Sequence, residues 1–272
     1  MRATATKTNY ARRVHIARLS LTPLKGMAHH HPESLEIEPN GPRDDRRFCL
    51  VDPARDRVLR TVENPTLVGC RAAFDGTNLS VQLADGTGAS AVVGDGRTRR
   101  VDYWGRTVAV DVVDGPWADL LSRQLGRSVA LARVEPGQVV FGGSVTLLTT
   151  SSLREVAARL GQQLDPVALL ADSERFRSTV VLDTGDAPAF VEDTWRSVGL
   201  GAVTVRVRGP VPRCAVVRIA PGRGVVEAAD PLRALAADRT EVNDRGREVV
   251  FGVDADVVVP GLVAVGDTVQ PS

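Results

Sequence analysis

Short apolar runs separated by turn residues dominate the first half of the chain. Valine, leucine, isoleucine and phenylalanine gather in these runs, and pairs such as Asp75-Gly76 and Asp85-Gly86 stand between several of them. The segments that we predict as strands are 14–21, 48–52, 57–61, 67–74 and 79–83. Strands and turns that alternate about every ten residues are typical of an antiparallel barrel or sandwich.

Helical spacing of apolar residues appears at three places further along the chain. Each place also carries residues that can begin or end a helix. The predicted helices are 116–125 with Asp114 as cap and Gly126 as stop, 152–160 with the capping-box pair Ser152 and Glu155 and with Gly161 as stop, and a short helix from Asp230-Pro231. Further strands are predicted at 179–182, 203–207, 215–219, 249–253 and 263–269.

This order of elements predicts a mostly β protein with a few helices, an α+β arrangement. Strands and helices do not alternate regularly, so a doubly wound parallel sheet is disfavoured. Glycine and polar residues cluster at 85–110, and we place a domain boundary there. The predicted organisation is a flexible N-terminus at 1–13, a first β domain at 14–100 and a second domain at 101–272.

Composition places the chain among globular proteins. Its 272 residues are 43% hydrophobic, which is enough for one large core or two smaller ones. It contains no apolar run of about 18 residues, the length that a membrane-spanning helix needs. The net charge of +1 gives no overall attraction to nucleic acid or to acidic membranes, so an anion site must be local. Residues 1–13 are poor in acids, which fits a frayed terminus or a transit peptide.

Cysteines and lysines are scarce, which makes each of them informative. Cys49, Cys70 and Cys214 are widely spaced and odd in number, which suits a reducing cytoplasm better than a disulfide framework. They form no CxxC pair, so zinc ribbons and thioredoxin-like motifs are excluded. The 34 basic residues include just two lysines, Lys7 and Lys25. A lysine in such a chain indicates a position that arginine would not serve.

Several short strings follow one another in an order and at a spacing that resemble one known family. They are 21–26 (LTPLKG), 45–52 (DRRFCLVD), 63–68 (ENPTLV), 149–153 (TTSSL), 175–177 (RFR), 190–195 (FVEDTW), 213–214 (RC), 251–252 (FG), 260–261 (PG) and 265–267 (VGD). Each string is weak alone. Together they resemble the MOSC (molybdenum cofactor sulfurase C-terminal) domain with its N-terminal β-barrel partner. That family includes the mitochondrial amidoxime-reducing component and bacterial relatives.

The resemblance implies a fold, a cofactor and a reactive residue. The fold would be a MOSC-type β-barrel at 101–272 beside a β-barrel-like subdomain at 14–100, with a cleft that holds a molybdenum–molybdopterin cofactor. Cys214 would supply the thiolate that ligates the metal and would be the catalytic residue. The residues themselves allow this, because a thiolate is a soft ligand and the adjacent Arg213 would favour it over the thiol. A buried, inert cysteine at the head of the apolar strand 215–219 is the alternative.

Four basic residues are candidates for binding the cofactor. Lys25, Arg46 and Arg177 match positions in the family, and the pterin cofactor carries a phosphate. Arginine binds phosphate as a two-pronged fork, whereas lysine acts as a compact point charge. Arg213 is a weaker candidate, since it could orient the loop of Cys214 instead of contacting the cofactor. For each of these residues, the alternative is an ordinary solvated surface position.

Other polar residues have two interpretations each. Thr149 and Thr150 begin a predicted helix and could offer hydroxyl and N–H groups to the cofactor, although simple N-capping would explain the local sequence equally well. Glu192 and Asp193 could transfer protons or could pair with arginines in a structural role. The histidine run at 29–31 has no partner at metal-binding spacing and is predicted to be a solvated loop.

The chain departs from the family pattern at three places on the presumed cofactor wall. Gly26 stands where the family has serine, so a hydroxyl is missing. Ser178 and Thr179 replace a Pro and an Asn, and their hydroxyls could compensate. Pro212 stands two residues before Cys214, where relatives with reductase activity usually carry a small polar residue.

Three functions follow from these observations. The first is a molybdenum-dependent oxidoreductase that reduces N-hydroxylated small molecules, with electrons from a separate reductase or ferredoxin, since the chain has no iron–sulfur, haem or flavin motif. The second is a molybdenum-independent sulfur carrier, or a cysteine-dependent biosynthetic enzyme, that uses Cys214. The third is a non-catalytic binding module. No nucleic acid or membrane partner is expected.

Overall fold

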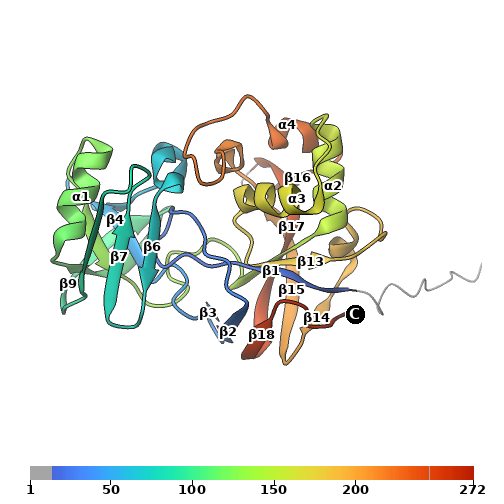
Figure 1. The fold of residues 1–272 in the computed structure, drawn as a ribbon, viewed down its shortest axis with the longest axis horizontal. Coiled ribbons are helices and arrows are strands. Elements are labelled where there is room, and N and C mark those ends of the chain that lie inside the picture. The colour runs from blue at the N-terminus through green and yellow to red at the C-terminus, as the bar shows by residue number, and fades with distance from the viewer. Residues whose placement is uncertain (1–13, 245) are drawn as a thin grey trace, which may run out of the picture.

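The computed structural model describes residues 14–244 and 246–272. The flexible N-terminus predicted at 1–13 lies outside these residues. The described chain is built mostly from strands, with a few helices, and forms two β units side by side (Figure 1). The predicted fold class is confirmed. Among the described residues, none of the helices is both long and apolar enough to cross a membrane.

The first unit is a closed barrel with a small sheet and a helix packed against it. The barrel strands are β4 (Phe48–Asp52), β5 (Arg57–Val58), β9 (Gly96–Tyr103), β10 (Arg106–Val113) and β11 (Ala130–Arg133), in the order β10-β11-β4-β5-β9. The small sheet contains β6 (Arg71–Phe74), β7 (Asn78–Gln82) and β8 (Gly88–Val92). Helix α1 (Pro116–Leu125) buries Trp117, whose indole N–H donates to the Leu79 carbonyl at 2.8 Å. Gly115, rather than Asp114, is the residue at its N-cap.

The second unit is an eight-stranded sheet with a three-stranded sheet beside it. The larger sheet contains β1 (His15–Leu19), β13 (Val180–Asp183), β12 (Val145–Thr149), β17 (Gly246–Val259), β15 (Val203–Pro212), β14 (Ser197–Leu200) and β19 (Val269–Pro271) in that order, and β16 (Thr240–Asn243) pairs with β17. The smaller sheet contains β18 (Gly261–Ala264), β2 (Ser34–Glu38) and β3 (Gly41–Pro42). The central strand β17 is buried on both faces, since one core cluster contains Val253 and another contains Phe251.

The described chain begins in the second unit, passes through the first unit and then returns to the second. Strand β1 pairs with β13 in the larger sheet and β2 pairs with β18 in the smaller one, so the first described strands lie in sheets that are built mainly from the end of the chain (Figure 1). The barrel follows and continues to β11, beyond the boundary that we placed at residue 100. The glycine and polar residues at 85–110 form hairpin turns within the first unit, for example at Trp104-Gly105, and not a linker.

A parallel crossover in the second unit was not expected from the sequence. Strands β12 and β13 run parallel, and helices α2 (Thr150–Arg159) and α3 (Pro166–Ser173) connect them. Helix α2 begins two residues earlier than predicted, because the Thr149 hydroxyl accepts a hydrogen bond from the Ser152 N–H and caps it. Helix α3 was missed, although Asp165 caps it and Pro166 opens it. Helix α4 (Pro231–Leu235) follows its cap Asp230, as predicted.

Some apolar runs that we predicted as strands are 3-10 turns instead. The predicted strand 215–219 is the turn η6 (Ala215–Arg218), and parts of 57–61 and 67–74 are η2 (Thr61–Glu63) and η3 (Pro65–Gly69). Two further turns are η4 (Glu174–Phe176) and η5 (Val191–Thr194). A short apolar run has the same pattern in a buried strand and in a buried turn, so periodicity does not separate them.

Candidate functional site

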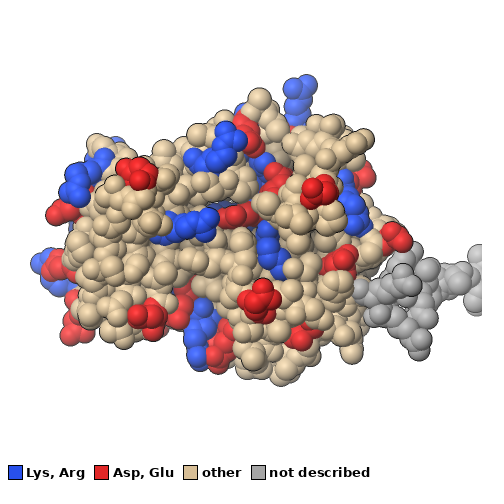
Figure 2. All heavy atoms as spheres, viewed as in Figure 1, with Lys and Arg blue, Asp and Glu red and all other residues tan. Residues whose placement is uncertain are grey.

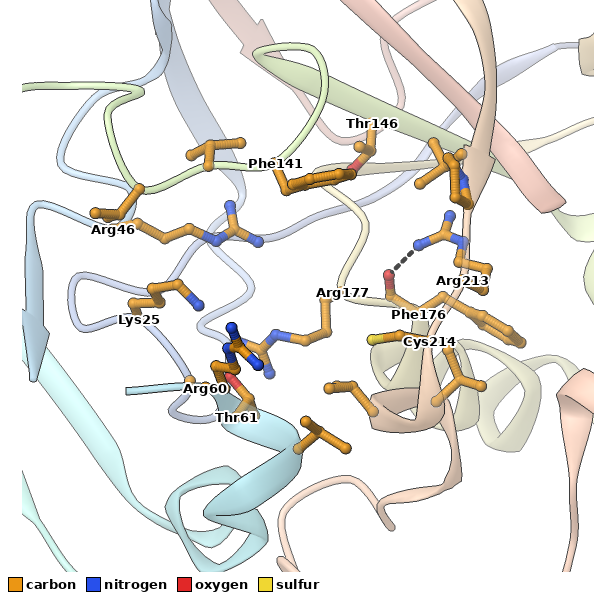
Figure 3. Close-up of a pocket in the computed structure, with 18 of the residues that line it drawn as sticks. Lys25, Arg46, Arg60, Thr61, Phe141, Thr146, Phe176, Arg177, Arg213 and Cys214 are labelled. Carbon is orange, nitrogen blue, oxygen red and sulfur yellow. Dashed lines mark hydrogen bonds between the residues drawn. The ribbon is translucent and has the colours of Figure 1, made fainter. Parts of the chain in front are cut away.

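A cavity of about 330 Å³ lies where the two units meet. Its size falls in the usual range for small-molecule sites. The wall contains Lys25, Arg46, Arg177, Arg213 and Cys214, which are far apart in the sequence (Figure 3). The structure therefore brings together five of the seven residues that the sequence singled out.

Cys214 is the accessible cysteine of the three. It follows the end of β15 and forms the N-cap of η6, and its side chain points into the cavity (Figure 3). Cys49 and Cys70 are buried, and burial raises the pKa of the Cys49 thiol to about 12. Of the two alternatives for Cys214, the buried cysteine is therefore wrong. The predicted strand after it is also wrong, because the chain turns at η6 and leaves the thiol at the surface of the cavity.

Lys25 lies in the opposite wall, just after β1. Its backbone N–H donates to the Phe48 carbonyl at 2.9 Å, and its ammonium lies 5.5 Å from the centre of the Tyr103 ring. Burial, followed by the charges of Arg46 and Arg177, lowers the pKa of the Lys25 ammonium to about 8. Among the described residues, no carboxylate lies within ion-pair distance of it. The charge is thus held by the fold without a counter-ion from the protein.

Arg46 and Arg177 both have a left-handed backbone, with φ angles of 49° and 55°. This conformation is uncommon for residues with a side chain, and it concentrates at functional positions. Arg46 pairs with Asp45, whereas Arg177 donates from Nη2 to the Met27 carbonyl at 2.8 Å. Burial, and then the charge of Arg46, lowers the pKa of Arg177 to about 10. Their proximity concentrates positive charge at this end of the cavity.

Arg213 is held firmly by backbone carbonyls. Its Nε donates to Phe251 and its Nη1 to Phe176, both at 2.7 Å, and the guanidinium lies over the Phe176 ring (Figure 3). Burial lowers the pKa of Arg213 to about 10, and the neighbouring Cys214 opposes this shift. These contacts fix the chain immediately before Cys214. They support the expected role of Arg213 in orienting the loop.

Thr149 and Thr150 do not line the cavity. The Thr149 hydroxyl donates to Glu192 at 2.8 Å and caps α2, and the Thr150 hydroxyl donates to Asp183 at 3.0 Å. Their hydroxyls are therefore engaged within the protein, and N-capping is the interpretation that the structure supports. Glu192 is buried, and burial raises its pKa. It binds the hydroxyls at the start of α2, while Asp193 pairs with Arg239, so both acids are structural.

The departures from the family pattern have different structural consequences. Gly26 has a left-handed φ of 94°, and a Cβ on it would lie 3.1 Å from the Thr61 hydroxyl, which lines the cavity. Thr61 thus places a hydroxyl beside the position where the family has serine. Thr179 lines the cavity too, whereas the Ser178 hydroxyl donates to the Thr146 carbonyl at 2.9 Å and is not in the wall. Pro212 ends β15 within the wall.

Other contributors to the wall had no signal in the sequence. They are Arg60 just before the 3-10 turn η2, Tyr103 and Trp104 in a hairpin, and Phe141 in a loop, and they meet through tertiary structure alone. The solvated loop predicted for the histidine run is wrong for His29, which is buried and whose backbone N–H donates to the Glu174 carboxylate at 2.9 Å, whereas His31 is exposed. On the face of the molecule shown in Figure 2, basic and acidic side chains are interspersed.

Two family models match the chain. The model described as the MOSC N-terminal beta barrel domain matches residues 13–128, and the model described as the MOSC domain matches residues 136–270. Together they span most of the chain, and their limits agree with a first unit that ends near β11.

Curated relatives match a smaller part of the chain. Mitochondrial amidoxime reducing component 2 of Homo sapiens is 30% identical over 128 residues, which are 45% of this chain and 35% of that protein. Mitochondrial amidoxime-reducing component 1 of Xenopus laevis is 31% identical over 130 residues, 46% of this chain and 35% of that protein. The matched part is about a third of the length of these relatives. The YUAD protein of Bacillus subtilis has a solved structure with a TM-score of 0.44 and 12% identity, covering 94% of this chain and 93% of that one.

Proposed function

This chain belongs to the MOSC domain family, and we propose that its cavity binds a molybdenum–molybdopterin cofactor and reduces N-hydroxylated small molecules. Molybdenum cofactors are associated with this family, and the matched relatives are amidoxime-reducing components. The chain matches only part of those relatives, so the reaction, its substrates and its electron donor are all part of the proposal.

The observation that carries the proposal is an accessible thiol in one cavity with cations that lack a carboxylate partner. Cys214 points into a wall that also contains Lys25, Arg177 and Arg213, and none of these three has a carboxylate within ion-pair distance among the described residues. A thiolate suits a soft metal, and arginine and lysine suit a phosphate. The donor set therefore fits a cofactor that has both a metal and a phosphate.

The residues of this chain have distinct roles in the proposed reaction. Arg46 and Arg177 would bind the phosphate, and Cys214 would supply the thiolate ligand. Bound molybdenum would supply two-electron redox chemistry. Reduction of an N–OH group consumes two electrons and two protons and releases water. With a pKa of about 8, the Lys25 ammonium holds a proton at neutral pH that it can donate.

The electrons would come from a separate reductase or ferredoxin. Among the described residues, no group of three or more Cys, His, Asp or Glu side chains is arranged to hold a metal ion. The cavity itself would admit the small-molecule substrate.

The decisive test is the metal content of protein made in a host that synthesises the cofactor. Wild-type protein is expected to contain near-stoichiometric molybdenum by mass spectrometry, and Cys214→Ser is expected to lose most of it, because a hydroxyl is a poor ligand for a soft metal. Circular dichroism would show that Cys214→Ser still folds, as its side chain is outside the core. Molybdenum that stays bound to Cys214→Ser, or is missing from the wild type, would contradict the proposal.

A second function is favoured by the absence of a hydroxyl at Gly26 and by the Ser178 hydroxyl, which donates to the Thr146 carbonyl and does not line the cavity. If the cavity holds no metal, the Cys214 thiolate would take the outer sulfur of a donor persulfide, whose thiol leaves, and would carry that sulfur as its own persulfide within the same electropositive wall. Intact-protein mass spectrometry would then show one extra sulfur, which a thiol reductant removes and which Cys214→Ser does not acquire. An unmodified Cys214 in molybdenum-free protein would exclude this function.

A further inference from the structure

The turn between β9 and β10 carries a tryptophan in a backbone conformation that bulky residues rarely adopt. Tyr103 pairs with Arg106 across the turn, within which Trp104 and Gly105 have φ angles of 54° and 78°. Turns of this kind normally contain Asn-Gly or Gly-Gly, because both central residues are left-handed. A tryptophan there is strained, and such strain persists mainly where function requires it.

Core packing does not account for Trp104. Its side chain is 45% exposed, whereas the other two tryptophans of the chain, Trp117 and Trp195, are 0% and 8% exposed. The neighbouring core cluster includes the preceding Tyr103 but not Trp104. The strain of the turn is therefore not offset by burial of the indole.

Trp104 stands instead in the cavity wall, next to a second exposed aromatic ring. Phe141 is 48% exposed, and its ring centre lies 6.4 Å from that of Trp104 with the planes at 60°. The guanidinium carbon of Arg60 lies 4.1 Å from the centre of the Trp104 ring and holds the indole in place. All three residues line the cavity that contains Cys214. Arg60 and Phe141 are labelled in Figure 3.

We propose that Arg60, Trp104 and Phe141 form a substrate-recognition rim that selects N-hydroxylated substrates carrying a planar aromatic ring. This inference rests on the proposed function and names the substrate class of the same site. The ring of the substrate would contact Trp104 and Phe141, and its N–OH group would point inward toward Cys214. Exposed aromatic side chains favour such contacts, because ring pairs gain energy beyond the area that they bury.

The charges of the wall fit the direction of the reaction. An N-hydroxylated amidine is neutral at neutral pH, whereas the amidine that it yields is protonated. A cation is disfavoured beside the ammonium of Lys25, so the neutral substrate enters a wall that repels the protonated product. The rim thus selects substrates by their aromatic ring, and the positive charge inside the cavity promotes release of the protonated product.

Binding can be tested without the cofactor or the electron donor. Trp104 is the exposed tryptophan of the three, and exposed tryptophans emit at longer wavelengths than buried ones. A change in long-wavelength tryptophan fluorescence on adding a ligand therefore reports binding at the rim. An aryl amidoxime is expected to change this emission saturably, while an alkyl amidoxime leaves it unchanged. In Trp104→Asn, which restores the preferred Asn-Gly turn while removing the indole, affinity for the aryl compound measured by calorimetry is expected to fall about tenfold. Equal affinity for both compounds in the wild type would overturn the inference.

Kinetics of the molybdenum-loaded enzyme provide the second test. Trp104→Asn and Phe141→Leu are each expected to raise KM for the aryl amidoxime about tenfold, with kcat and the KM of the alkyl compound unchanged. Equal effects on both compounds would overturn the rim and leave the proposed function intact. If loaded wild-type enzyme reduces neither compound, the proposed reaction fails, and the binding titration still decides whether the rim selects rings.

Discussion

Lys25 carries a charge that folding destabilises. Its pKa of about 8 in the folded protein lies below the ordinary 10.5, because folding places the ammonium in a partly buried wall beside other cations. The unfolded chain therefore binds this proton more tightly. The resulting loss of stability is complete below pH 8 and disappears as the pH rises toward 10.5.

The prediction at this scale concerns the pH dependence of unfolding. Without cofactor, Lys25→Met is expected to be more stable than the wild type at neutral pH, by on the order of 3 kcal/mol. The wild type is expected to close this gap between pH 8 and pH 10.5. Urea unfolding of both proteins across that range measures it. If the free energies of unfolding of the wild type and of Lys25→Met differ by the same amount at every pH, folding does not destabilise the ammonium.

At the scale of elements, β17 changes the face on which it packs. Residues two apart in a strand normally share a face, yet Phe251 and Val253 belong to different core clusters. Gly252 lies between them with a left-handed φ of 68°, and the register of β15 against β17 shifts nearby. The bend also places the Phe251 carbonyl where it accepts from Arg213. Gly252 therefore connects the core of the sheet with the position of Cys214.

Replacement of Gly252 tests this connection. A Cβ at Gly252 would overlap the Leu148 side chain and lie 2.7 Å from the Leu147 carbonyl, so Gly252→Ala is expected to cost about 3 kcal/mol in the free energy of unfolding. The matched control is Gly76→Ala, since Gly76 has φ 94° with nothing within 4 Å of its Cβ. It should cost about 1 kcal/mol, from the backbone alone. Equal losses in urea unfolding would show that crowding at Gly252 is unimportant.

At the scale of the whole molecule, the two units are connected because the chain passes from the second unit to the first and back again. Strands β1 and β2 precede the barrel in sequence but complete the sheets of the second unit. The cavity lies between the units and takes Lys25 and Arg46 from one side and Arg177 and Cys214 from the other. Neither unit alone contains the candidate site.

A truncation tests the dependence of the second unit on the start of the chain. Removal of every residue before Arg43 would leave β13 and β18 without their antiparallel partners and would expose new sheet edges. The truncated protein is expected to associate on size-exclusion chromatography and to melt at a lower temperature than the full chain. A monomer with an unchanged melting temperature would show that the second unit folds without β1 and β2.

The sequence by itself determined the features that depend on neighbouring residues. The strand at Phe48–Asp52 follows from a short apolar run bounded by turn residues, and the helices that begin at Pro116 and Pro231 follow from helical spacing and proline positions. Cys214 was identified from its pairing with Arg213 within an ordered set of family strings. These signals are local, so they can be read without knowing how the chain folds.

Tertiary structure alone decided what lies next to what. The apolar run after Cys214 has the same pattern in a strand and in a 3-10 turn, and packing against the second unit selected the turn that exposes the thiol. Thr149 and Thr150 could have faced an anion or the protein, and the buried Glu192 and Asp183 provided protein partners. Arg60, Trp104 and Phe141 had no shared sequence pattern. Their meeting depends on contacts between distant segments, which no local pattern records.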